Sequence, residues 1–253
     1  MHLLPDDIKA IERAACRGWP ALETADVDGW LWRCSSSGST RATTVLALEF
    51  TGSDADAAID KVVALYRSRG ATPRFLMTEV NEPADLEDRL AGRGWVRHGA
   101  SVTMAKDIAG APTDLALRPG IAVEQLDEPS DEWWSVYLSG LSANRRQAAP
   151  SLVANIPRPR VFFAARLAGT VISSGLTVLD GPLASVQCMA TSPHVRRSGG
   201  ATAVLAGIEA VAAEYGARRI YLQTDGDNAA AIGLYQRFGF AIVSRYHTRD
   251  LDV

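Results

Sequence analysis

Residues 193–215 combine arginines and glycines in a pattern that suits the binding of an anion. A strand-like run, residues 182–191, precedes them, and a helical pattern follows at about residues 199–215. At the start of a helix several backbone N–H groups lack intrahelical partners, and the helix dipole adds positive charge. Small residues let a phosphate approach these groups, and arginines add charge. The turn that joins strand to helix consists of Arg196, Arg197, Ser198, Gly199, Gly200 and Ala201.

The same turn also fits a less specific description, a flexible surface turn in front of a helix. Neither the GxxxxGK[ST] nor the GxGxxG pattern occurs, so the turn is not a standard nucleotide or dinucleotide loop. The helix after it is amphipathic, with Val204, Ile208 and Val211 on one face. That face is predicted to dock on a sheet, which leaves the helix start free for a ligand.

A second informative segment spans residues 228–240. It reads as a short helix in which Asn228, Ala231 and Tyr235 share a face. A phenol can donate a proton to a reacting group when it is well positioned. Taken alone, Tyr235 fits a core aromatic residue better than a catalytic one.

Together these two segments resemble the GNAT superfamily of acetyl-CoA-dependent N-acetyltransferases. The resemblance covers residues 119–250 and includes the order strand, loop, helix, strand, helix. The matching residues are Pro193-x-x-Arg196-Arg197-x-Gly199-x-Ala201 in the loop and Asn228, Ala231, Leu234, Tyr235, Gly239 and Phe240 downstream.

The resemblance implies that acetyl-CoA is the acyl donor and that the six turn residues hold its diphosphate. It implies that the backbone of Met189, Ala190 and Thr191 pairs with the pantetheine arm, and that an N–H near Met189 or Ala190 stabilises the oxyanion. It also implies that Asn228 hydrogen-bonds the pantetheine region and that Tyr235 protonates the departing thiolate. Direct transfer without an acyl-enzyme is expected.

The general base is left open. Many members of the superfamily place a glutamate on the strand before the loop, but residues 182–191 contain no acid. Cys188 lies there and fits packing better than nucleophilic catalysis. A water chain and an amine that arrives neutral are equally good alternatives. The side chains considered as bases are Glu124, Glu132, Asp225 and His194.

The strand and helix patterns predict an α+β fold with three layers. Strand-like runs at 160–167, 170–179 and 182–191 are joined by hairpin turns, and strand–helix units follow. We expect a mixed, mostly antiparallel sheet with helices on both faces, and the resemblance adds a splayed parallel pair. Residues 127–157 read as one or two helices broken near Pro150. Trp133, Trp134, Asn144 and Arg145 lie in this segment, where the resemblance implies acceptor specificity.

A composition change at residues 107–120 divides the chain into two predicted domains, 1–110 and 111–253. Both halves end in a similar helix–strand–helix–strand pattern, which indicates two GNAT-like domains in tandem. Residues 1–110 contain strand-like runs at 29–34 and 43–50 and a helix at 54–68, but no match to the loop or to Tyr235. This half is therefore expected to be a degenerate copy that does not bind CoA.

Composition excludes several other classes of function. The net charge of −3 and the sequence pI near 5.8 argue against a nucleic-acid partner. Absence of an apolar run of about 18 residues argues against a membrane span, and the acidic N-terminus argues against a signal peptide, so a cytoplasmic protein is expected. Three cysteines and four histidines are scattered without metal-ligand spacing, so no metal is expected.

The sequence thus predicts an enzyme, an acyltransferase that moves an acetyl group from acetyl-CoA to a primary amine of a small molecule or peptide. The alternative is a non-catalytic acyl-CoA-binding or regulatory protein. The sequence leaves open which amine is acetylated and whether the protein forms a homodimer.

Overall fold

The computed structural model describes residues 1–35, 39–108 and 118–252, apart from the side chain of Asn144. Contacts divide the chain into two compact units. Unit 1 comprises Met1–Thr103, Thr224–Asp227 and Ile242–Val253, and unit 2 comprises Met104–Gln223 and Asn228–Ala241. The predicted domain boundary between residues 110 and 111 lies outside the described residues.

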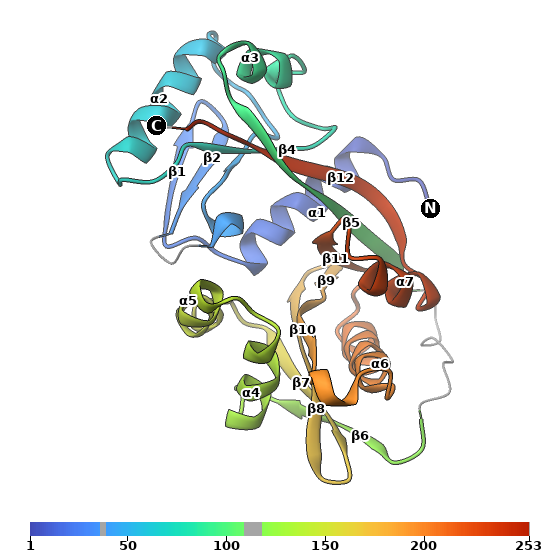
Figure 1. The fold of residues 1–253 in the computed structure, drawn as a ribbon. Helices are drawn as coiled ribbons and strands as arrows, with labels where there is room; N and C mark the ends of the chain where they lie inside the picture. The colour runs from blue at the N-terminus through green and yellow to red at the C-terminus, as the bar shows by residue number, and fades with distance from the viewer. Residues whose placement is uncertain (36–38, 109–117, 253) are drawn as a thin grey trace. The chain divides into compact units, whose positions relative to one another are not determined.

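Unit 1 forms a sheet in the order β1-β2-β3-β4-β12-β5 (Figure 1). Strands β3 and β4 are parallel, and β12 runs antiparallel to β4 from His247 opposite Met77 to Asp250 opposite Arg74. The elements of this unit are α1 (Pro5–Gly18), β1 (Glu23–Val27), β2 (Trp30–Cys34), η1 (Thr40–Ala42), β3 (Val45–Leu46), α2 (Ala55–Arg67), β4 (Arg74–Met77), α3 (Leu86–Gly92), β5 (Val96–Asp107) and β12 (Ala241–Asp250), of which β5 and β12 run into unit 2 at one end.

Charged side chains fix β12 in unit 1. Arg74 donates from Nε to both carboxylate oxygens of Asp250 at 2.8 and 2.9 Å, and both side chains are largely buried. Arg249 on β12 binds Glu87 on α3 and also donates to the carbonyl of Trp95. Bidentate arginine–carboxylate pairs are geometrically specific, so these contacts favour one register of β12 against β4.

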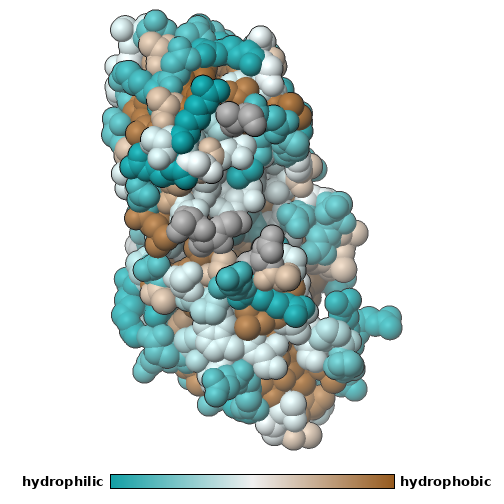
Figure 2. All heavy atoms as spheres, turned by 60° about the vertical axis from the view of Figure 1, so that its left-hand side comes forward, coloured by the Kyte–Doolittle hydropathy of each residue, from teal (hydrophilic) through white to brown (hydrophobic). Residues whose placement is uncertain are grey.

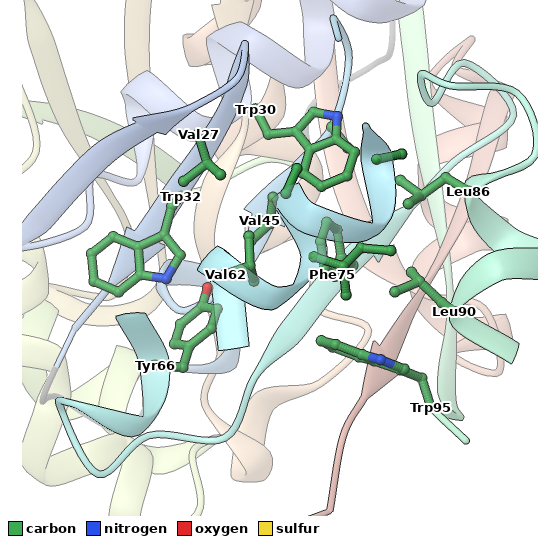
Figure 3. Close-up of a cluster of buried hydrophobic side chains, with 14 of the residues drawn as sticks. Val27, Trp30, Trp32, Val45, Val62, Tyr66, Phe75, Leu86, Leu90 and Trp95 are labelled. Carbon is green, nitrogen blue, oxygen red and sulfur yellow. The ribbon is translucent and has the colours of Figure 1, made fainter. Parts of the chain in front are cut away.

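The core of unit 1 is built from aromatic side chains packed between the sheet and α2. Trp30, Trp32, Tyr66 and Phe75 are almost completely buried, and Figure 3 shows them converging from β2, α2 and β4. The Phe75 ring contacts Trp30 and Trp95 edge-on at 5.3 Å. A core of this kind needs no ligand to fill it.

Unit 2 forms a sheet in the order β11-β9-β8-β7-β6, with β10 paired to β8. All of the strand pairs described in this unit are antiparallel except β9 with β11. The elements of this unit are β6 (Ile121–Leu126), α4 (Asp131–Ser139), α5 (Ala143–Ala154), β7 (Arg160–Leu167), β8 (Thr170–Asp180), β9 (Leu183–Ser185), β10 (Gln187–Thr191), η2 (Pro193–Val195), α6 (Gly200–Glu214), β11 (Arg219–Asp225) and α7 (Ala229–Arg237), of which β11 ends in unit 1.

Helices cover both faces of this sheet, as predicted. Figure 1 shows α4 and α6 on opposite sides of β7 and β8. Neighbouring residues of β7 show the alternation, since Phe162 packs against Trp133 of α4 whereas Phe163 contacts Gly207 of α6. The predicted α+β class, with a mixed and mostly antiparallel sheet, is therefore confirmed.

Two local predictions are wrong. The break in residues 127–157 falls between α4 and α5, where Ser142 adopts an extended N-cap conformation, and Pro150 lies inside α5. The strand predicted at 43–50 is only Val45–Leu46, because the carbonyl of Ala47 accepts hydrogen bonds from the loop residues Asn81 and Glu82 instead of from a strand.

None of the helices formed by the described residues combines the length and apolar character that crossing a membrane requires. On the face shown in Figure 2, hydrophobic residues form separate areas among hydrophilic ones. The large hydrophobic side chains that are most exposed are Met1, Leu4, Leu22, Val96 and Tyr215.

Candidate active site

The turn before α6 adopts a conformation that depends on glycine. Gly199 is the N-cap residue with a φ of +96°, in the left-handed region, and Arg197 also has a positive φ of +61°. A Cβ on Gly200 would lie 2.4 Å from Ser173 Oγ on β8. The first glycine is therefore required by backbone conformation, and the second by close approach of the helix to the sheet.

The N-terminus of α6 keeps its backbone donors free of the chain's own side chains. Within the described part of the chain no side chain caps this helix, and its first turn contains no acid. The first intrahelical bond runs from Ala203 N to Gly199 O at 3.0 Å. The N–H groups of Gly200, Ala201 and Thr202 thus precede the helical ladder and suit an anion.

Polar side chains at this turn also lack partners. Ser198 is 7% exposed, and its Oγ is buried without a hydrogen-bond partner among the described residues. Buried hydroxyls are normally hydrogen-bonded, so this hydroxyl points to a group that the described residues do not supply. Arg196 and Arg197 are exposed, and neither guanidinium forms an ion pair with another described residue.

Helix α2, which corresponds in unit 1 to α6, begins with acidic side chains. Asp54 caps α2, and its Oδ1 accepts hydrogen bonds from Asp56 N and Ala57 N at 2.9 and 3.1 Å. Asp56 adds a second carboxylate in the first turn. Negative charge already occupies this helix start, so α2 is unsuited to phosphate, in keeping with the expectation that the first half does not bind CoA.

The strand before the loop separates from β11 but stays paired with β8. Strand β9 pairs in parallel with β11, and Val186 N still donates to Tyr221 O at 2.8 Å. Its continuation, β10, pairs with β8. The register shifts between Gln187 and Ala190, and Cys188 has a φ of +52°. This bulge lies where the parallel pair separates, as the predicted splay requires.

The pairing of β10 places backbone groups on the edge away from β8. Ser192 N donates to Ile172 O at 2.9 Å, and Thr191 lies opposite Ser173. Because backbone groups alternate in an antiparallel ladder, the N–H and carbonyl of Thr191 point away from β8. Met189 lies in the bulge, with its sulfur 2.9 Å from the position of a Cβ on Gly175.

Asn228 has a structural task that the sequence did not reveal. It is the N-cap residue of α7, and its Oδ1 accepts a hydrogen bond from Ala231 N at 3.1 Å. The side chain is exposed, which leaves its NH₂ group to donate to a ligand.

Tyr235 is a buried residue of α7. It is 7% exposed, and its ring lies 5.9 Å from that of Phe240. Burial raises the pKa of the Tyr235 phenol to about 12. The hydroxyl forms no hydrogen bond with another described residue, so the neutral phenol keeps its proton available.

None of the proposed bases is set up for that role by its surroundings. Glu124 and Glu132 accept hydrogen bonds from Arg166 at 3.0 and 2.7 Å, and the Arg166 bond lowers the pKa of Glu132. His194 lies exposed in η2, and Asp225 belongs to unit 1. Within the described ranges no group of three or more His, Cys, Asp or Glu side chains could hold a metal ion.

The residues considered for acceptor specificity divide into two kinds. Trp133 is completely buried, and its Nε1 donates to Gly175 O at 3.2 Å, so it is a packing residue. Trp134 is half-buried and Arg145 is exposed, which keeps both accessible to a ligand. The side chain of Asn144 lies outside the described part.

Comparison with known proteins decides the family. The family model described as the C-terminal region of the probable histone acetyltransferase Rv0428c matches residues 6–249. The chain belongs to this family. The chain is 26% identical to the "Uncharacterized N-acetyltransferase YobR" of Bacillus subtilis (strain 168), over 96% of the chain and 98% of that protein. It is 27% identical to the "Probable histone acetyltransferase Rv0428c" of Mycobacterium tuberculosis, over 51% of the chain and 38% of that protein.

Solved structures agree with the fold of the chain. A GCN5-related N-acetyltransferase from Kribbella flavida superposes with a TM-score of 0.76 and 14% identity, covering 100% of this chain and 97% of its own. A tandem GNAT protein from the clavulanic acid biosynthesis pathway superposes with a TM-score of 0.63 and 14% identity, covering 95% and 87%. The predicted GNAT fold and its tandem form are confirmed.

Sequence reasoning missed one neighbour of the loop. Arg118 lies just before β6, and its Cβ is 3.3 Å from the position of a Cβ on Gly199. The two residues are far apart in the sequence, and only the packing of β6 and α6 on the same unit brings them together. An unpaired arginine next to a predicted strand is too common a signal to single it out.

Proposed function

We propose that this chain transfers the acetyl group of acetyl-CoA directly to a primary amine of a small molecule or peptide, with Tyr235 as the general acid. The observation that carries the proposal is the start of α6. Here backbone donors, the Ser198 hydroxyl and two arginines meet without a partner among the described residues and without an acid in the first turn. A doubly charged diphosphate provides the acceptors that these groups lack.

The separation of β10 from β11 supports binding of the pantetheine arm. The backbone groups of Thr191 on the free edge of β10 can pair with the amides of pantetheine as with an added strand. In this arrangement the thioester reaches the bulge, where a backbone N–H of Met189 or Ala190 stabilises the negative oxygen of the tetrahedral intermediate. Asn228 contributes its NH₂ group to the same arm.

The raised pKa of Tyr235 defines how it assists the leaving group. Burial raises the pKa of the Tyr235 phenol to about 12, whereas a free thiol has a pKa of about 8.5, so proton donation to the thiolate depends on positioning and not on acidity. Tyr235 therefore gives up its proton as the C–S bond breaks and negative charge collects on sulfur, which is the role of a general acid. The attacking amine releases one proton to solvent and the tyrosinate takes one back, so the reaction ends with an amide, a CoA thiol and a neutral phenol.

Turnover tests the proposal. CoA thiol release is measured with acetyl-CoA and a panel of small amines together with lysine-containing peptides, because the family description names histones. We expect thiol release that depends on one class of amine. Binding of acetyl-CoA without amine-dependent thiol release would instead favour a non-catalytic acyl-CoA-binding protein.

Direct transfer leads to an expectation for Cys188. This residue lies in the β10 bulge with a positive φ, and its carbonyl accepts a hydrogen bond from Ser174 Oγ at 3.3 Å. If the amine attacks the thioester directly, Cys188→Ala retains kcat within about threefold, since it removes only the thiol. The rate of thiol release at saturating acetyl-CoA measures this. A loss of about 10²-fold, together with an acetylated wild-type Cys188 in mass spectra, would establish an acyl-enzyme instead.

A further inference from the structure

The loop before α6 has a cationic neighbour that comes from a different element. Arg118 precedes β6, and its Cβ and Cδ lie 3.3 and 4.0 Å from the position of a Cβ on Gly199. Its carbonyl closes a turn by accepting from Ile121 N at 3.3 Å. The aliphatic stem of Arg118 therefore lies directly against the N-cap of α6.

Among the residues that the structure describes, none pairs with the charged end of Arg118. The residue is exposed, and its guanidinium forms neither a hydrogen bond nor an ion pair with another described residue. Other arginines of unit 2 form ion pairs with acids, as Arg158 and Arg160 do with Glu128. A guanidinium is always charged and presents donors in a planar fork that matches phosphate.

The groups of the loop itself indicate which phosphate of CoA is left for Arg118. The diphosphate is served by the backbone donors of α6, by the buried Ser198 hydroxyl and by Arg196 and Arg197, all within the loop itself. CoA carries one more phosphate, a monoester on the ribose 3′ oxygen. A phosphate monoester has nearly two negative charges at neutral pH, and it stands outside the backbone cradle.

We propose that Arg118 binds the 3′-phosphate of CoA and makes the enzyme selective for donors that carry it. This inference rests on the proposed function, because it assumes that the diphosphate occupies the start of α6. It extends that function to discrimination between CoA and donors that end in the diphosphate or in pantetheine alone.

Calorimetric titration with acetyl-CoA and with acetyl-3′-dephospho-CoA tests this proposal. The variant is Arg118→Met, which keeps an apolar stem against Gly199 and removes the charge. We expect wild-type protein to bind acetyl-CoA about 10-fold or more tightly than the dephospho donor, since a hydrogen bond to a charged group is worth that much. In Arg118→Met the preference disappears, while the Kd for the dephospho donor is unchanged.

The matched control is Arg218→Ala. Arg218 is also exposed and follows the opposite end of α6, so the variant loses the same charge far from the loop. It should keep the preference for acetyl-CoA. Equal weakening of both donors in Arg118→Met would show that Arg118 supports the loop or the diphosphate, and unchanged binding of both would make it a packing residue; either result overturns the assignment. Wild-type protein that binds neither donor would overturn the proposed function itself, and this inference with it.

Discussion

Tyr235→Phe is expected to lower kcat by about 10²-fold or more while the Kd for acetyl-CoA stays nearly unchanged, because only the transition state loses a donor. The ring remains buried against Phe240, so removal of the hydroxyl leaves the packing of α7 intact. Steady-state kinetics of thiol release, with calorimetric titration of acetyl-CoA, measure the two quantities separately.

The pH dependence of wild-type activity also tests the role of the Tyr235 hydroxyl. Burial holds the pKa of Tyr235 at about 12, above its ordinary value, so the phenol keeps its proton below that pH. Activity should therefore show no alkaline decline from this group up to about pH 10.

Tyr215→Phe is the matched control for Tyr235→Phe, since Tyr215 is 59% exposed at the end of α6. An unaltered kcat in Tyr235→Phe would remove this residue from the mechanism.

Gly199→Glu is expected to abolish measurable binding of acetyl-CoA. A glutamate places a negative charge and a side chain where the diphosphate approaches the start of α6, and its carboxylate can itself satisfy the free N–H groups. The variant also forces a residue with a Cβ into a φ of +96°, at a cost of about 1–2 kcal/mol of stability. Calorimetric titration is the measurement, preceded by circular dichroism to verify folding.

Gly216→Glu separates the two effects. Gly216 follows the other end of α6 with a φ of +77°, and a Cβ there would meet no atom within 4 Å. The variant has the same strained conformation and the same added charge, but it lies far from the loop. We expect it to bind acetyl-CoA normally. Normal binding by a folded Gly199→Glu protein would mean that the diphosphate binds elsewhere.

The loop and the α7 helix could be predicted from the sequence because their signals are local. A turn with Gly199 and Gly200 before an amphipathic run predicts an uncapped helix start, and the spacing of Ala231 and Tyr235 after Asn228 predicts a short helix. The predicted α2 helix is confirmed for the same reason, since Asp54 and the spacing of its apolar residues are encoded within one segment.

What the sequence did not show depends on contacts between distant segments. The contact of Gly200 with Ser173 and that of Arg118 with Gly199 arise only when α6 packs on the sheet. The ion pair of Arg166 with Glu124 requires the pairing of β6 with β7, and its ion pair with Glu132 joins β7 to α4. Tertiary contacts likewise shortened the strand predicted at 43–50, because the Ala47 carbonyl found partners in a later loop.

The position of β12 next to β4 has a consequence for biosynthesis. Residues 242–250 complete the sheet of a unit whose first strand lies near residue 23, so a ribosome must deliver all of the residues between them before that unit can close. During synthesis β4 exposes an edge that other strands could occupy, and unit 2 has every one of its strands except β11 before residue 219 emerges. Unit 1 is thus expected to reach its native state after unit 2.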